Sequence, residues 1–165
     1  MILYKSQFIN NFNQKIYDQE MFASSFWNSS CPKCHETNTL SFYGRYSRSL
    51  YTDNGVITIR VQRCICSACN STHAVLPSFI IPYSRISVDD ACKIVSSDPS
   101  QLENIMVRLS IARAAILEIK RKFDIYWKNL VYNPCSFSDL SSFCIRSFNL
   151  QFLQIRFLYL FLIPT

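Results

Sequence analysis

Apolar and polar residues alternate most regularly between Val56 and Arg63, where the sequence reads VITIRVQR. In an extended strand this alternation separates two faces, an apolar one with Ile57, Ile59 and Val61 and a polar one with Thr58, Arg60 and Gln62. The preceding stretch 40–51, LSFYGRYSRSLY, also has a strand composition. Asn54-Gly55 lies between them, and this dipeptide is typical of tight hairpin turns because both residues tolerate positive φ. The pattern predicts a β-hairpin with a half-buried second strand.

Helical periodicity replaces the alternation from Ser87 onward, a residue suited to an N-cap. Pro99 is suited to the first turn of a second helix, and a further joint is expected near Ser110. For the last and longest helix the expected inward side chains are Ile111, Ala115, Ile119, Phe123 and either Tyr126 or Trp127. Three helices with short joints match the outline of a helix-turn-helix unit.

Two cysteine pairs flank the predicted hairpin, Cys31-Pro32-Lys33-Cys34 before it and Cys66-Ser67-Ala68-Cys69 after it. Two residues between cysteines let one turn direct both thiolates at one ion, and two such turns supply a closed tetrahedral Zn²⁺ site. The ligands expected are therefore Cys31, Cys34, Cys66 and Cys69, with Cys64, His73 and His35 as alternates. A closed site is structural, so the pattern predicts a zinc ribbon. The isolated cysteines, Cys92, Cys135 and Cys144, are expected to be ordinary thiols.

The composition suits a folded, mildly basic protein. Hydrophobic residues make up 49% of the 165 residues, charged residues make up 17%, and the net charge is +6. This charge suits an anionic partner without identifying it. The candidate contacts to DNA phosphates lie on the hairpin and the last helix: Arg45, Arg48, Arg60, Arg113, Lys120, Arg121 and Lys122. A solvated strand or helix face has the same composition, so the DNA hypothesis depends on the ribbon beside it.

Catalysis is not expected. With only Gly44 and Gly55, the chain has no glycine-rich phosphate loop, and its carboxylates are scattered. A zinc deaminase carries His-x-Glu ahead of its cysteine pair, whereas His35-Glu36 follows the pair here. The N-terminus MILYKSQFINNFNQ lacks the apolar core of a signal peptide. A cytoplasmic location is therefore expected, where the cysteines stay reduced.

The expected organisation is α+β: a lead-in over 1–30, a zinc-ribbon-like domain over 31–83, a helical helix-turn-helix-like region over 84–132, and an apolar tail over 133–165. Phe, Leu and Ser make up more than half of 135–165. Because Arg146 and Arg156 interrupt this stretch, a membrane span is not expected. We interpret the tail as the result of truncation or a disrupted reading frame. An alternative to DNA binding is a zinc-stabilised module that docks a protein partner through this tail.

The stretch from Cys31 to Tyr83 resembles a family of uncharacterised bacterial proteins, a domain of unknown function associated with transposases. The matching motifs are Cys31-Pro32-Lys33-Cys34, Gly44 to Arg48, and RCICSACNSTHAVLPSFIIPY over 63–83. The resemblance implies a zinc-ribbon-like element joined to a helix-turn-helix-like region in a mobile-element protein. This sequence departs from the family pattern in having His35 in place of the usual glycine and an additional Cys64. The resemblance supplies no activity.

Overall fold

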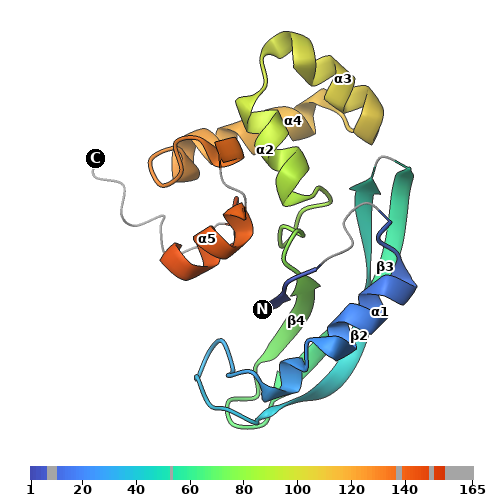
Figure 1. Ribbon diagram of the computed structural model, residues 1–165, viewed down its shortest axis with the longest axis vertical. Helices are drawn as coiled ribbons and strands as arrows, with labels where there is room; N and C mark the ends of the chain where they lie inside the picture. The colour runs from blue at the N-terminus through green and yellow to red at the C-terminus, as the bar shows by residue number, and fades with distance from the viewer. Residues whose placement is uncertain (7–10, 53, 137–138, 149–150, 155–165) are drawn as a thin grey trace. The chain divides into compact units, whose positions relative to one another are not determined.

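The computed structural model describes residues 1–6, 11–52, 54–136, 139–148 and 151–154. The chain divides into two compact units, Met1–Ile80 and Ile81–Thr165 (Figure 1). The described strands that pair into the sheet lie in the first unit, and the second unit is helical. The predicted α+β class is confirmed.

A long hairpin forms the centre of the first unit. Strand β2 (Leu40–Thr52) pairs antiparallel with β3 (Gly55–Cys66), and the register runs from Leu40 opposite Cys66 to Thr52 opposite Gly55. Gly55 has a φ of +99°, a conformation that glycine adopts without a Cβ clash. The hairpin predicted from alternation and from the Asn-Gly pair is present.

Two further strands extend the hairpin into a mixed sheet with the order β1-β4-β3-β2. Strand β4 (Thr72–Pro77) runs antiparallel to β3, and β1 (Ile2–Tyr4) runs parallel to β4. The β3–β4 ladder is short, pairing Arg63–Ile65 with Thr72–Ala74. The part of β3 that precedes Arg63 lies outside this ladder, so its backbone groups on that edge need other hydrogen-bond partners.

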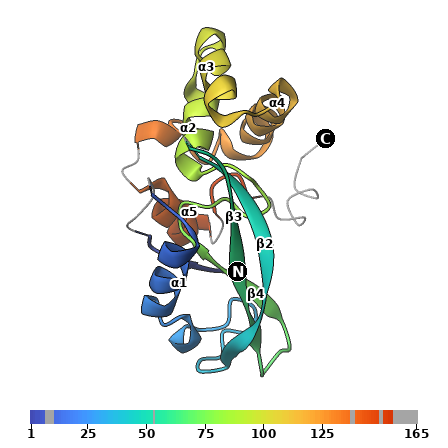
Figure 2. The same cartoon turned by 90° about the vertical axis from the view of Figure 1, so that its right-hand side faces the viewer.

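Helix α1 (Gln14–Ala23) supplies those partners from the side of the sheet (Figure 2). The Gln14 side chain donates to the Arg60 carbonyl over 3.4 Å and accepts from the Arg60 amide over 2.6 Å. One turn later, the Tyr17 hydroxyl accepts from the Gln62 amide and donates to the Val75 carbonyl, both over 2.8 Å. Residues three apart share a helix face, so α1 protects the strand edge with two side chains.

A β-bulge interrupts the β2–β3 ladder, where the register shifts between Phe42 and Gly44. The Gln62 side chain donates to the Gly44 carbonyl over 2.9 Å and accepts from Arg45 Nε over 3.1 Å. Gln62 is only 4% exposed, so its predicted place on a solvated polar face is wrong. Hydrogen bonds to the irregular backbone make the burial of this amide acceptable.

The second unit contains α2 (Val88–Ser96), α3 (Pro99–Leu109) and α4 (Arg113–Lys122), and α4 continues into a π-helix, η2 (Phe123–Trp127). The Ser87 hydroxyl caps α2 by accepting from the Asp90 amide over 3.0 Å, and Pro99 opens α3, as predicted. The predicted inward position of Ala115 is wrong, because Ala115 is exposed and Ile116 is buried. The helix begins at Arg113, so helical periodicity cannot be counted from Ile111.

The described part of the apolar tail has packing partners in the second unit. It forms a 3-10 turn, η3 (Pro134–Ser136), and helix α5 (Leu140–Phe148). The buried Trp127 ring makes edge contacts with Phe148 and Phe152, at centroid distances of 5.9 and 5.4 Å. Arg156 and the apolar run after it lie outside the described residues. Among the helices that the structure describes, none is long and apolar enough to cross a membrane.

The Tyr17 hydroxyl provides a test of the α1–sheet junction. Tyr17→Phe removes both hydrogen bonds of the hydroxyl, the one to the buried Gln62 amide and the one to the buried Val75 carbonyl. We expect this change to lower the free energy of unfolding by about 1 to 3 kcal/mol, measured by urea titration of the metal-saturated chain. Tyr83→Phe is the matched control, because Tyr83 is fully exposed and should shift the value by less than about 0.5 kcal/mol. Equal effects of the two changes would contradict the bridging role.

Candidate metal centre

The first cysteine pair forms a tight knuckle just before β2. The Cys31 amide donates to the Glu36 carbonyl, and the His35 amide donates to the Cys31 carbonyl, each over 2.9 Å. His35 has a φ of 64°, in the left-handed region that favours glycine. This residue reverses the chain direction directly after Cys34.

The second pair repeats the same backbone pattern between β3 and β4. The Cys66 amide donates to the Ser71 carbonyl over 3.0 Å, and the Asn70 amide donates to the Cys66 carbonyl over 2.9 Å. Asn70, the residue after Cys69, is also left-handed with a φ of 54°. The two knuckles therefore share a backbone fold although their central residues differ.

Strand register brings the two knuckles together. Leu40, which begins β2, lies opposite Cys66, which ends β3, and the Ser67 amide donates to the Thr39 carbonyl over 2.9 Å. Both knuckles lie at the end of the hairpin that is far from its turn (Figure 1). The pairing of β2 with β3 thus delivers four thiols to one place.

The Sγ atoms of Cys31, Cys34, Cys66 and Cys69 all lie within 4.8 Å of one another. Cys31 is 3.7 Å from Cys69, and Cys34 is 3.6 Å from Cys66. A Zn–S bond of about 2.3 Å gives a tetrahedron with an S···S edge of about 3.8 Å. Donor type, number and spacing therefore fit a tetrahedral metal ion such as Zn²⁺.

Neighbouring groups favour the thiolate form of the second pair. The Thr39 hydroxyl, 3.2 Å from Cys66 Sγ, is the largest of the hydrogen-bond contributions that lower the pKa of the Cys66 thiol to about 6. Hydrogen bonds from Ser71 lower the pKa of Cys69 in the same way. In the first pair, the Lys33 amide donates a hydrogen bond to Cys31 Sγ over 3.4 Å. Since metals bind thiolates, these donors suit metal binding.

The structure places the three alternate ligands differently with respect to the cluster. Cys64 is buried and its thiol donates to the His73 carbonyl over 3.5 Å, outside the four-sulfur group. His35 is exposed. His73 is buried, its Nε2 atom lies 3.3 Å from Cys31 Sγ, and burial lowers its pKa below the usual value. The sequence predicts His73 only as an alternate ligand. Its place beside Cys31 depends on the pairing of His73 with Cys64 across β3 and β4, a register that the sequence does not reveal.

Comparison with known families identifies the domain that contains this cluster. A family model described as a domain of unknown function, DUF6431, matches residues 31–113. The chain belongs to this family. The matched range of the DUF6431 domain begins at Cys31, includes all four clustered cysteines and His73, and ends at the first residue of α4. No curated protein and no solved structure matches the chain.

The predicted DNA contacts on the hairpin of the DUF6431 domain differ in their surroundings. Arg45 is held by an ion pair to Asp18 at 2.9 Å and by its hydrogen bond to Gln62. Arg48 is half-buried on β2, opposite Ile59. Arg60 is exposed on β3, with its backbone held by Gln14. Of the three, Arg60 is the most open to an anionic partner.

The basic residues of α4 are likewise unequal. Arg121 makes two hydrogen bonds to Glu118, over 2.9 and 3.0 Å, and Lys120 donates to the Ser97 carbonyl over 2.9 Å. Arg121 lowers the pKa of Glu118 through these contacts. Arg113 is exposed at the N-terminal end of α4.

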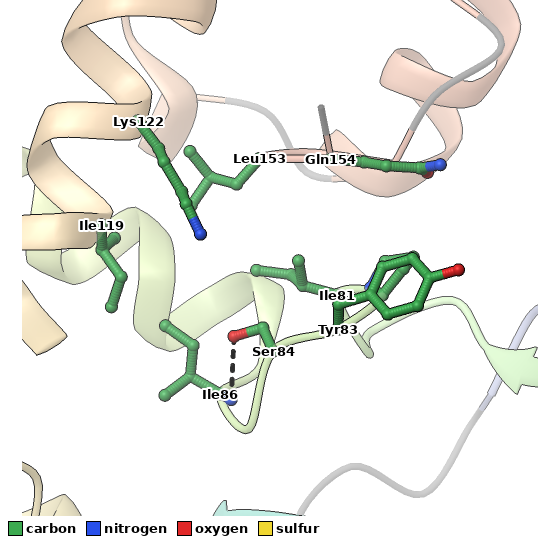
Figure 3. A pocket seen from close by; sticks show the side chains of 9 residues that line it. Ile81, Tyr83, Ser84, Ile86, Ile119, Lys122, Leu153 and Gln154 are labelled. Atoms are coloured by element: carbon green, nitrogen blue, oxygen red, sulfur yellow. Dashed lines mark hydrogen bonds between the residues drawn. The ribbon is translucent and has the colours of Figure 1, made fainter. Parts of the chain in front are cut away.

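Lys122 lines a hollow of about 150 Å³ in the second unit. Figure 3 shows its side chain directed into the same space as Ile81, Ile119 and Leu153. The ammonium group also lies 3.5 Å from Glu118. Lys122 is therefore less open to a phosphate than Arg113 is.

The isolated cysteines of the second unit differ in burial. Burial is the largest effect on Cys92 and Cys144, and it raises the pKa of each to about 12. Cys135 is exposed and its thiol lies 3.3 Å from the Ser96 hydroxyl. The raised pKa keeps the Cys92 and Cys144 thiols protonated at neutral pH, so these two are poor nucleophiles.

A pair of alanine variants tests which cysteine of β3 binds metal. Cys66→Ala removes a member of the four-sulfur cluster, and we expect it to lower bound zinc to well below one equivalent after a chelator challenge. Cys64→Ala is the matched control, because Cys64 lies two residues away on the same strand and outside the cluster. The Cys64→Ala variant should keep one equivalent of zinc, measured by native mass spectrometry. The reverse result would contradict the ligand set.

Proposed function

We propose that this DUF6431 protein is a DNA-binding module whose hairpin is held by a structural Zn²⁺ ion bound to Cys31, Cys34, Cys66 and Cys69. When bound, the ion supplies structural stability and a fixed geometry at the closed end of the sheet. Four thiolates fill its tetrahedral shell, which leaves no position for a substrate. The module therefore acts by binding.

The observation that carries the zinc part is the repeated knuckle. Two backbone turns with the same hydrogen bonds and the same left-handed residue present four sulfur atoms at tetrahedral spacing. Metal binding at such a site contributes on the order of 10 kcal/mol to folding. The small unit around it gains from this contribution, because a short sheet with one helix buries a limited core.

Exposed basic residues support the DNA part. Arg60 on the hairpin and Arg113 at the start of α4 are both exposed, and the chain carries a net charge of +6. The short turn through Ser110, which is left-handed with a φ of 50°, joins α3 to α4 and is compatible with a helix-turn-helix arrangement. The resemblance to transposase-associated proteins points to the same class of partner. On this proposal the protein is the recognition part, or a remnant, of a transposase-related protein.

Salt dependence of duplex binding tests the DNA part. Phosphate contacts release counterions, so the logarithm of affinity should fall by roughly one unit per phosphate contact for each tenfold rise in salt. The measurement is fluorescence anisotropy of a labelled duplex with the zinc-loaded chain at several salt concentrations. Binding that ignores salt, or an absence of binding, would refute the proposal.

Single charge removals locate the contacts. Arg60→Gln and Arg113→Gln should each weaken duplex binding and lower the slope by about one unit, if each side chain meets one phosphate. Arg121→Gln is the matched control, because its guanidinium is already held by Glu118 and should matter less. A larger loss in Arg121→Gln than in both other variants would show that the exposed arginines are not the contacts.

A zinc-stabilised protein-interaction module is the second candidate, and a group of exposed aromatic side chains favours it. Phe22 and Phe42 are 50% and 49% exposed, and their ring centroids lie 5.8 Å apart. Phe42 also contacts Trp27, at 5.8 Å. Such exposed aromatic groups are enriched at protein interfaces. The test is co-purification of a partner after nuclease treatment. A partner that the unaltered chain retains and the double variant Phe22→Ala/Phe42→Ala loses, together with an absence of salt-dependent DNA binding, would favour this second candidate.

A further inference from the structure

His73 lies against the sulfur cluster in a position that differs from that of a ligand. Its Nε2 atom is 3.3 Å from Cys31 Sγ, and its side chain is buried. The four sulfur atoms already provide a complete tetrahedral set without it. A buried imidazole beside a full set of thiolates needs another role.

The chemistry of the two groups fixes the direction of this contact. A metal-bound thiolate carries negative charge and has no proton to donate, so it acts only as an acceptor. The imidazole nitrogen 3.3 Å away must then carry the proton, and the contact becomes an Nε2–H···S hydrogen bond. Neutral histidine supplies this donor in one of its two tautomers, so no change of charge is required.

Strand β4 holds His73 in this place. The register pairs His73 with Cys64 across the β3–β4 ladder, and the Cys64 thiol donates to the His73 carbonyl over 3.5 Å. The buried Cys64, which has no place in the four-sulfur group, thus contacts the residue that contacts Cys31. Strand β4 is in this way connected to the knuckle that precedes β2.

We infer that His73 is a positioning residue for the metal site, which donates an Nε2–H hydrogen bond to the Cys31 thiolate and raises metal affinity without binding the ion. The inference rests on the proposed zinc site. Four thiolates and one Zn²⁺ ion leave a net charge of −2, and hydrogen-bond donors offset part of it. The Lys33 amide, two residues from Cys31, and His73, 42 residues from it, would both donate to the Cys31 thiolate.

Cadmium-113 NMR of the full chain, labelled with ¹⁵N-histidine, tests this role directly. The expected result is a ¹¹³Cd resonance in the range of tetrathiolate sites, with a weak coupling from ¹¹³Cd to the His73 Nε2 proton across the hydrogen bond. A resonance of the three-sulfur, one-nitrogen type, with direct coupling to imidazole nitrogen, would make His73 a ligand and overturn the inference. This readout uses the unaltered protein, so it does not depend on a variant that folds.

Variants then measure the size of the effect. His73→Leu should lower zinc affinity by about 10- to 100-fold in chelator competition while keeping the tetrathiolate ¹¹³Cd resonance, because outer hydrogen-bond partners have effects of this size. His73→Gln, which keeps a donor, should recover part of the loss. His35→Asn is the matched control: His35 is exposed, and asparagine tolerates its left-handed φ of 64°.

The outcomes separate the two proposals. If the chain binds no metal, the zinc site itself is refuted and the inference falls with it. If the chain binds one tetrathiolate metal ion but His73→Leu leaves affinity unchanged, only the role of His73 is refuted. Equal losses in His73→Gln and His73→Leu would also overturn it, because the donor would then be irrelevant.

Discussion

Four cysteine thiols meet at one end of the β2–β3 hairpin, and the fold of the first unit depends on this meeting. A two-stranded hairpin alone is marginally stable in water. Here the end opposite the turn is tied by two knuckles, which place the sulfur atoms of Cys31 and Cys69 3.7 Å apart. One ion bound there would join residues that are distant in the sequence and fix the register of both long strands.

The sheet is completed by segments on either side of the hairpin in the sequence. Helix α1 protects the β3 edge through Gln14 and Tyr17, and β1 adds a parallel strand beyond β4. Gln14 and Tyr17 therefore pair with backbone groups of β3 that lie outside the short β3–β4 ladder. The hydrophobic core of this unit includes Tyr17, Met21 and Phe26 from this region.

Charge in the sequence and charge available to a partner are different quantities in this protein. Arg45 is engaged by Asp18, Arg121 by Glu118, and Lys120 by a backbone carbonyl. Exposed ion pairs of this kind add little stability, but they reduce the potential that a DNA phosphate would meet. Arg60 and Arg113 are the predicted contacts whose exposure best suits an anionic partner.

Local patterns in the sequence were sufficient to predict the hairpin, the two knuckles, the Ser87 cap and the start of α3 at Pro99, because each depends on residues close together in the chain. The tertiary structure decided what depends on register and on distant packing. It placed His73 beside Cys31 and buried Gln62 at a bulge. The spacing to Cys69 already favours Cys66 over Cys64, although alternation gives both cysteines the same side of a strand. The position of His73 depends on the β3–β4 register, which no local pattern specifies.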